Sequence, residues 1–378
     1  MVTFVNFNEI RMIDYSLYKE GSIQGRYITM ESLANCFSNL ETPIIHIGDS
    51  VNGLPIKGFK LGSGTRKVLM WSQMHGNEST TTKAVWDLVN FLSQDKELGK
   101  TILANCTLII VPILNPDGAK LYTRENSNEI DLNRDAKNLT QPESIAFRKL
   151  FESFAPDFCF NLHDQRTLFS AGNNDKPATV SFLSPASNKE RHITPTRETA
   201  MKLIVAMNNM LQNEIPGQVG RYDDGFNDNC IGDTLQMLGV PTILFESGHY
   251  PRDYEREKTR EYIFKAMVEA LKIIAHDKIE TYKTGDYFSI PGNKKLFFDV
   301  LIKHPELVNS EFEAGHSVGI RYKEVLKEQK IIFKPEIAEI GPLEGYFGHE
   351  TIECIDIKDF GFTSNQKDIL NLLLNFNK

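Results

Sequence analysis

The sequence predicts an α/β fold, with a mixed, largely parallel central sheet, helices on both faces, and a small, mostly β C-terminal appendage. Apolar runs suited to buried strands alternate with segments whose apolar residues recur every three or four positions, as in amphipathic helices. This alternation is typical of a sheet covered by helices on both faces. After Lys278 the runs become short, strand-like and broken by Gly and Pro. We therefore expect one domain over residues 1–278 and a smaller one over 279–378.

The first elements are expected to be a short helix and a hairpin. Residues 27–40 ("YITMESLANCFSNL") have a helical pattern. Two alternating runs follow within residues 43–64, on either side of Asn52-Gly53. This dipeptide favours a two-residue turn, so the sheet should open with antiparallel strands.

Strands and helices then alternate to about residue 276. The apolar runs predict strands at 67–74, 106–114, 156–162 and 240–246. The periodic segments predict helices at 79–94, 140–154, 194–212 and 252–276. Residues 115–138 are polar and predict a loop, and Thr140 and Glu143 have the spacing of a capping box at the start of the next helix.

Composition excludes several classes of protein. The 378 residues carry a formal net charge of -8, with a pI near 5.7 and no Lys/Arg cluster, so we expect no nucleic-acid partner. No apolar stretch reaches membrane-spanning length, so we expect no membrane partner. Five cysteines, an odd number with no C-x-x-C pair, favour free thiols and a cytoplasmic location.

Four of the apolar runs end in polar residues able to do chemistry. These endings are His75-Gly-Asn-Glu78, Asn115-Pro-Asp-Gly118, His163-Asp164 and Glu246-Ser-Gly-His249. In open α/β sheets, ligands bind in the crevice outside the carboxyl ends of the strands. The four endings therefore predict a single site.

Two imidazoles and a carboxylate, with water in the fourth position, form a catalytic zinc centre of the His₂Glu type. His75, Glu78 and His163 supply this set, which predicts one Zn²⁺ per chain. Glu246, at the end of another strand, is placed to take a proton from the water. His249 is expected to be a rim or packing residue, because three protein ligands already complete the set.

The combination of His75-x-x-Glu78, "NPDG", "RENSNEIDLNRD", "NLHD" and "LFESG" resembles the zinc carboxypeptidase family over about residues 43–275. The resemblance implies that His75, Glu78 and His163 bind zinc and that Glu246 is the general base. It also implies that Asn133 and Arg134 hold the terminal carboxylate of the substrate, while Arg124 polarises the scissile carbonyl and stabilises the oxyanion.

The chemistry of arginine agrees with these implied roles. A guanidinium is a planar fork of donors that fits a carboxylate, which suits Arg134, and Arg124 can meet charge that develops in the transition state. Two arginines in one polar loop also fit a solvated face.

Tyr222 is the candidate for the mobile-loop tyrosine of the family, at an imperfect spacing. Asp164 is either an acceptor behind a metal-bound histidine or a loop cap.

Three functions are compatible with this site. The first is a zinc exopeptidase that removes a C-terminal residue from a peptide. The second is a zinc amidase or deacylase acting on small N-acyl amino acids or cell-wall peptides. The third, a binding module without catalysis, would require loss of a ligand or of the base, and both are present. Four aspartates precede Glu246 in the sequence: Asp223, Asp224, Asp228 and Asp233. This group indicates either a preference for a basic residue at the substrate C-terminus or a solvated turn.

Overall fold

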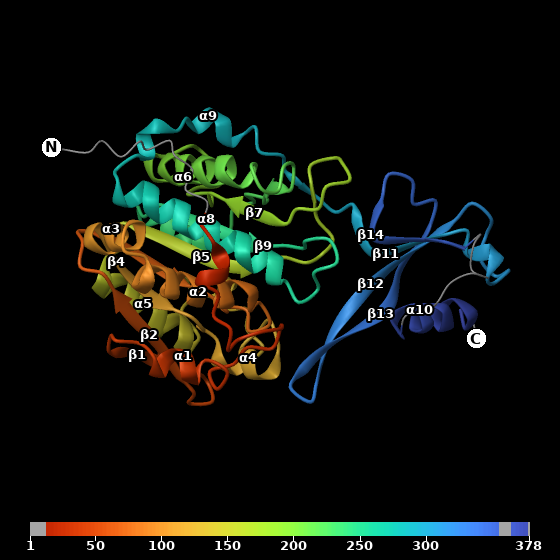
Figure 1. The fold of residues 1–378 in the computed structure, drawn as a ribbon, viewed down its shortest axis with the longest axis horizontal. Coiled ribbons are helices and arrows are strands. Elements are labelled where there is room, and N and C mark those ends of the chain that lie inside the picture. The colour runs from red at the N-terminus through yellow and green to blue at the C-terminus, as the bar shows by residue number, and fades with distance from the viewer. Residues whose placement is uncertain (1–12, 355–363, 377–378) are drawn as a thin grey trace.

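The structure, a computed structural model, describes residues 13–354 and 364–376 (Figure 1). Its larger sheet has the order β1-β2-β4-β3-β5-β9-β7-β8. The central strands β4, β3, β5 and β9 run parallel, while β1, β2 and β7 introduce antiparallel pairs. The predicted mixed, largely parallel sheet is therefore confirmed. Its strands are β1 (Ile44–Asp49), β2 (Pro55–Leu61), β3 (Arg66–Trp71), β4 (Cys106–Val111), β5 (Phe158–Asp164), β7 (Val180–Leu183), β8 (Val219–Arg221) and β9 (Thr242–Ser247).

Helices cover both faces of this sheet, as predicted (Figure 1). One face packs in a large apolar core against α1 (Ala34–Ser38), α2 (Thr80–Gln94), α3 (Leu98–Asn105), α6 (Pro195–Leu211) and α8 (Glu257–Ala275). The other face packs against α5 (Pro142–Phe154) and α7 (Ile231–Met237). None of the described helices is both long and apolar enough to cross a membrane.

Several predicted boundaries were wrong for local reasons. The helix expected over 27–40 is limited to α1, because Thr29 and Ser32 exchange side-chain hydrogen bonds with each other's backbone N–H groups. The helix expected from residue 252 begins at Glu257, where the Asp253 carboxylate accepts from the first free N–H groups. The elements α3, α7, β7 and β8 were not predicted.

The segment predicted as a loop, 115–138, contains α4 (Pro116–Leu121) and the 3₁₀ helix η2 (Leu132–Arg134). The capping box at Thr140 and Glu143 was also wrong. Pro142 occupies the first turn of α5, so the helix is preceded by Gln141 and not by Thr140. The Glu143 carboxylate instead accepts from the Val51 N–H at 3.1 Å.

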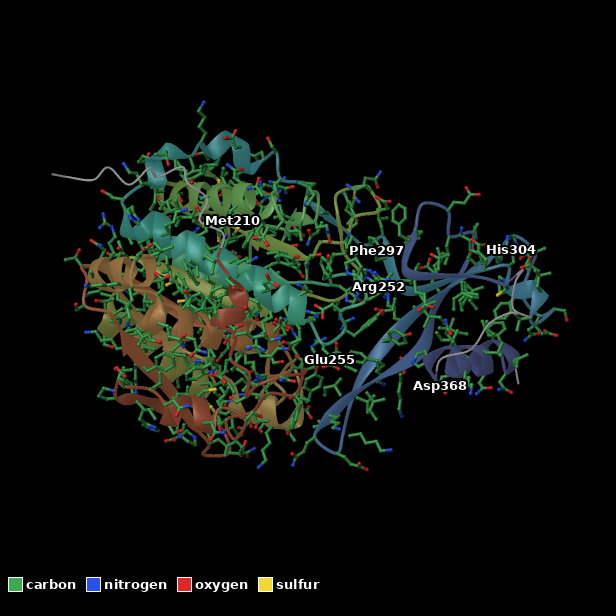
Figure 2. All side chains as sticks on the ribbon, in the orientation of Figure 1. Met210, Arg252, Glu255, Phe297, His304 and Asp368 are labelled. Carbon is green, nitrogen blue, oxygen red and sulfur yellow. The ribbon has the colours of Figure 1, made fainter. Side chains whose placement is uncertain are left out.

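The C-terminal part forms a separate four-stranded sheet of order β13-β12-β11-β14, as the mostly β pattern predicted. Its strands are β11 (Phe297–Lys303), β12 (Ser317–Lys327), β13 (Lys330–Gly341) and β14 (Phe347–Glu353), with α10 (Ser364–Leu374) beside them. The short strands β6 (Ser170–Ala171) and β10 (Asn293–Lys294) pair at the junction with the larger sheet. Between α8 and β10, the chain carries α9 (Thr284–Tyr287) and the 3₁₀ helix η3 (Ile279–Thr281). Figure 2 shows Phe297 on the side of the smaller sheet that faces the larger domain and His304 on its far side.

Candidate metal and active site

Strand pairing brings His163 and Glu246 together. They end β5 and β9, and they are direct partners in the parallel register. Partners in adjacent strands project to the same face, so the imidazole and the carboxylate lie side by side at the carboxyl end of the sheet. Both side chains are buried.

The loop after β3 carries His75 and Glu78 into the same place. Gln73 turns the chain with a positive φ of 42°, and its Nε2 donates to the Gly76 carbonyl oxygen at 2.8 Å. Gly76 lies directly against the backbone of Gly118 in the "NPDG" turn: a Cβ on Gly76 would be 1.9 Å from the Gly118 carbonyl carbon. Only glycine permits that approach, which explains why these two motifs meet.

Three potential ligand atoms converge at this point. His75 Nδ1 and His163 Nδ1 each lie 2.8 Å from a different oxygen of Glu78, and 3.1 Å from each other. Tetrahedral zinc with bonds of about 2.0–2.1 Å needs ligand atoms roughly 3.3 Å apart, close to these separations. Burial lowers the pKa of His163, which favours the neutral form that binds metal. Burial acts the same way on His75, but the carboxylates of Glu78 and Asp131 outweigh it and raise its pKa.

Asp131, which the sequence interpretation did not assign, supports the His75 ring from behind. Its Oδ1 lies 3.0 Å from His75 Nε2, and its Oδ2 accepts from Arg124 Nε and Nη2 at 3.1 and 3.0 Å. A carboxylate behind a metal-binding histidine fixes the tautomer and the ring orientation. The signal in the sequence was the aspartate of "DLNRD", two residues before Asn133.

Asp164 does not accept from a candidate metal-binding histidine, so that reading was wrong. Its carboxylate accepts from the Thr80 and Thr81 N–H groups at 2.9 and 3.4 Å and from the Ser247 hydroxyl at 2.5 Å. It therefore caps the start of α2 and links β5 to β9. This role is closer to the loop cap that was the second alternative. The backbone N–H of Asp164 donates to Glu78 Oε2 at 3.1 Å, which helps to fix that carboxylate.

The predicted carboxylate-binding residues lie on η2. Asn133 Oδ1 accepts from the Ile231 N–H at 3.2 Å, which leaves the amide N–H₂ as the donor toward the cleft. Arg134 is exposed, and its Nη1 donates to the Asn133 carbonyl oxygen at 2.7 Å. Arg124 is anchored by Asp131, and its Nη1 lies 3.4 Å from Glu78 Oε1.

Glu246 is a buried carboxylate, and one of its oxygens, Oε2, has no hydrogen-bond partner among the described residues. Burial, together with the charges of Glu78 and Asp164, raises its pKa well above the usual range. A divalent cation bound nearby would lower the pKa of Glu246. The group is thus placed to exchange a proton with a molecule that enters the site.

Tyr222 and His249 occupy different surroundings. Tyr222 packs its ring against Phe169, and burial and the charges of Glu246 and Glu78 raise its pKa. His249 is buried away from the three ligand atoms, with its ring 4.2 Å from that of His349 and 4.7 Å from that of Tyr254. It is a packing residue, as expected.

All eight predicted site residues line one cleft of about 840 Å³. That volume is in the range of small-molecule and short-peptide sites. The residues are His75, Glu78, Arg124, Asn133, Arg134, His163, Tyr222 and Glu246.

The fold and the His-Glu-His group define a metal-dependent α/β protein with its site at the carboxyl end of the central strands. A family model described as zinc carboxypeptidase matches residues 27–231. The chain therefore belongs to the zinc carboxypeptidase family, and the resemblance read from its motifs is confirmed. Zinc is the cofactor of that family, and the ligand set fits it.

Curated relatives match over part of their length. Carboxypeptidase 2 of Trichophyton rubrum is 27% identical over 132 residues, covering 33% of this chain and 24% of the relative. Carboxypeptidase SOL1 of Arabidopsis thaliana is 31% identical over 119 residues, covering 26% of this chain and 24% of the relative. The matched stretch thus spans about a quarter of each of these proteins.

Solved structures share the fold. A metallo-carboxypeptidase from Burkholderia cenocepacia has a TM-score of 0.54 at 18% identity, covering 66% of this chain and 70% of the other. A metallo-carboxypeptidase from Pseudomonas aeruginosa has a TM-score of 0.52 at 17% identity, covering 67% and 70%. At these identities the likeness establishes the fold.

Proposed function

We propose that the protein is a zinc-dependent carboxypeptidase that hydrolyses the C-terminal peptide bond of peptides. One observation carries the proposal: a complete His₂Glu ligand set, a buried carboxylate at register with it, and an Asn–Arg pair line the same cleft. His75, Glu78 and His163 would hold the metal. When bound, zinc supplies Lewis acidity that makes water a nucleophile near neutral pH.

Glu246 is the general base in this proposal. Its unpartnered Oε2 accepts the proton of the attacking water and then delivers it to the leaving amine. Arg124, held by the two hydrogen bonds that it donates to Asp131, presents its guanidinium to the carbonyl oxygen as negative charge develops there. Tyr222, on the same cleft, covers the bound substrate.

Arg134 and Asn133 select a free C-terminus. Within the described ranges Arg134 has no ion-pair partner, so its fork is available to a carboxylate. The Asn133 amide is aligned beside it by its bond to the start of α7. A substrate carboxylate would pair with this guanidinium.

Asp233 supports a preference for substrates with a basic C-terminal residue. Of the four aspartates before Glu246, Asp224 pairs with Arg197 and Asp228 with Lys137, so these two are structural. Asp233 is buried, lines the cleft and is otherwise held by the Asn227 N–H at 2.7 Å. A lysine or arginine side chain at the substrate C-terminus would pair with it.

The location proposed is the cytoplasm, since all five cysteines are free thiols and four of them are buried.

The test compares one peptide with a free and with an amidated C-terminus, with and without a chelator. We expect chelator-sensitive release of the last residue from the free peptide, and Arg134→Ala should lower kcat/KM for it far more than for the amide. Equal turnover of the two peptides, or equal losses on mutation, would contradict the exopeptidase and favour the amidase or deacylase.

A further inference from the structure

The C-terminal sheet forms one wall of the active-site cleft. Arg321, Lys323, Phe333 and Ile337 of the β12–β13 hairpin line it, together with Lys295 at the junction. Figure 1 shows the hairpin running along the larger domain past α4. These residues lie outside the stretch 27–231 that the family model matches.

Glu324 fastens the hairpin to the larger domain. Its carboxylate lies 3.0 Å from Arg26 Nη2 and accepts from the Tyr122 hydroxyl. Burial opposes the charge on Glu324, but Arg26 and the buried Arg256 outweigh it and lower its pKa. Arg26 is buried and Glu324 is partly buried, so this pair ties the hairpin to the larger domain.

The hairpin and the carboxylate anchor are held in the cleft by different elements. The anchor is held by η2 and the start of α7, through Asn133 and Ile231. The hairpin is held by Arg26, Tyr122 and Tyr254, whose ring lies 5.2 Å from that of Tyr322. A peptide with its terminal carboxylate at Arg134 and its scissile bond at Glu246 would direct its N-terminal portion toward the hairpin.

Within the described residues, the side chains of three cations of the cleft make no ion pair or hydrogen bond: Arg166, Lys295 and Arg321. They belong to one junction. The Phe297 N–H donates to the Leu168 carbonyl oxygen at 3.1 Å, which sets the chain after Arg166 against the chain after Lys295. The Arg321 guanidinium lies 5.4 Å from the ring centroid of Phe298, beside the same segment.

Apart from Arg134, the proposed carboxylate anchor, the other cations of the cleft have an acidic partner. Arg26 pairs with Glu324, Arg124 with Asp131, and Lys323 lies 3.8 Å from Glu336. In a chain of net charge -8, the unmatched positive charge of the cleft other than Arg134 is therefore concentrated at this junction. Its natural complement is an anionic group on the ligand.

We propose that the junction of the hairpin with segment 295–298 binds the part of the substrate N-terminal to the scissile bond and prefers acidic residues there. The proposal rests on the carboxypeptidase function proposed above. It names the substrate class as short peptides with a carboxylate side chain upstream of the cleaved bond and, through Asp233, a basic residue after it.

The test uses peptides of one length and one C-terminal residue that differ only in Glu, Gln or Lys two residues before the scissile bond. At low salt we expect kcat/KM for Glu to exceed that for Lys on the order of fivefold, with the ratio shrinking at high salt. Arg321→Gln and Lys295→Gln should each reduce the ratio. Lys330→Gln, an exposed change on the same hairpin outside the cleft, should leave it unchanged.

Equal kcat/KM for the Glu and Lys peptides, or a ratio that survives the combined Arg166→Gln, Lys295→Gln and Arg321→Gln changes, would overturn this inference and leave the carboxypeptidase function standing. No hydrolysis of any peptide would instead contradict the proposed function. In that case binding of the same peptides to the Glu246→Gln variant, measured by calorimetry, would still decide the preference: tighter binding of Glu than Lys supports it, and equal binding refutes it.

Discussion

Asp131 and His75 are joined by a hydrogen bond in which the ring Nε2 lies 3.0 Å from the carboxylate Oδ1. The bond leaves Nδ1 of the same ring facing Glu78 and His163. It fixes the tautomer that a metal requires, since the ring nitrogen that carries the proton is turned toward Asp131. Because Asp131 also holds Arg124, one carboxylate positions a candidate ligand and a candidate catalytic group.

Asp131→Asn should therefore weaken zinc binding by about 10–100-fold while preserving the fold. The measurement is competition with a chromogenic chelator. His75→Ala removes a ligand outright and should release the metal, and exposed Asp175→Asn serves as the unaffected control. Zinc affinity equal to wild type in Asp131→Asn would show that the hydrogen bond does not tune the site.

Glu246→Gln should separate chemistry from metal binding. The amide keeps the shape of the side chain but cannot take a proton, so kcat should fall by roughly 10²–10⁴-fold. Zinc content should stay at one per chain, because Glu246 is not in the ligand group. Turnover close to wild type, or loss of zinc, would exclude Glu246 as the base.

The preference for a basic terminal residue should depend on pH through Asp233. Burial raises the pKa of this carboxyl to about 6. Asp233 is therefore neutral below that pH and charged above it, so the ratio of kcat/KM for C-terminal Lys over C-terminal Leu should rise between pH 5 and pH 7. The ratio cancels pH effects common to both substrates. In Asp233→Asn it should be flat, and an unchanged rise in that variant would assign the effect elsewhere.

Stability should depend on a buried ion pair behind the sheet. Asp87 of α2 and Arg260 of α8 are fully buried, with Nη2 2.6 Å from Oδ1, and Tyr15 donates to the same carboxylate. Asp87→Ala removes the fully buried partner of Arg260 and leaves only its contact with the partly exposed Glu257, so it should lower the free energy of unfolding by about 3–5 kcal/mol, seen in denaturant titration. The surface pair of Arg66 and Asp277 is the control: Asp277→Ala should cost less than about 1 kcal/mol. Similar losses in both would contradict this ranking.

The sequence by itself determined the strands β1 to β5 and β9, most of the long helices and the family. The local spacing of apolar residues predicts where strands end and which helix faces are buried. His75-x-x-Glu78, His163 and Glu246 all lie at the end of an apolar run. Because parallel strands present their carboxyl ends at one edge, position along the chain was enough to predict that these residues meet.

Only the tertiary structure decided what surrounds them. Asp131 reaches His75 across 56 residues, and Asp164 caps a helix 84 residues before it rather than a neighbouring loop. The wall formed by the C-terminal sheet depends on Glu324 meeting Arg26, almost 300 residues away in sequence. Such contacts produce no periodic pattern in the local sequence. They are determined by how separate helices and strands pack and by the need to pair each buried charge.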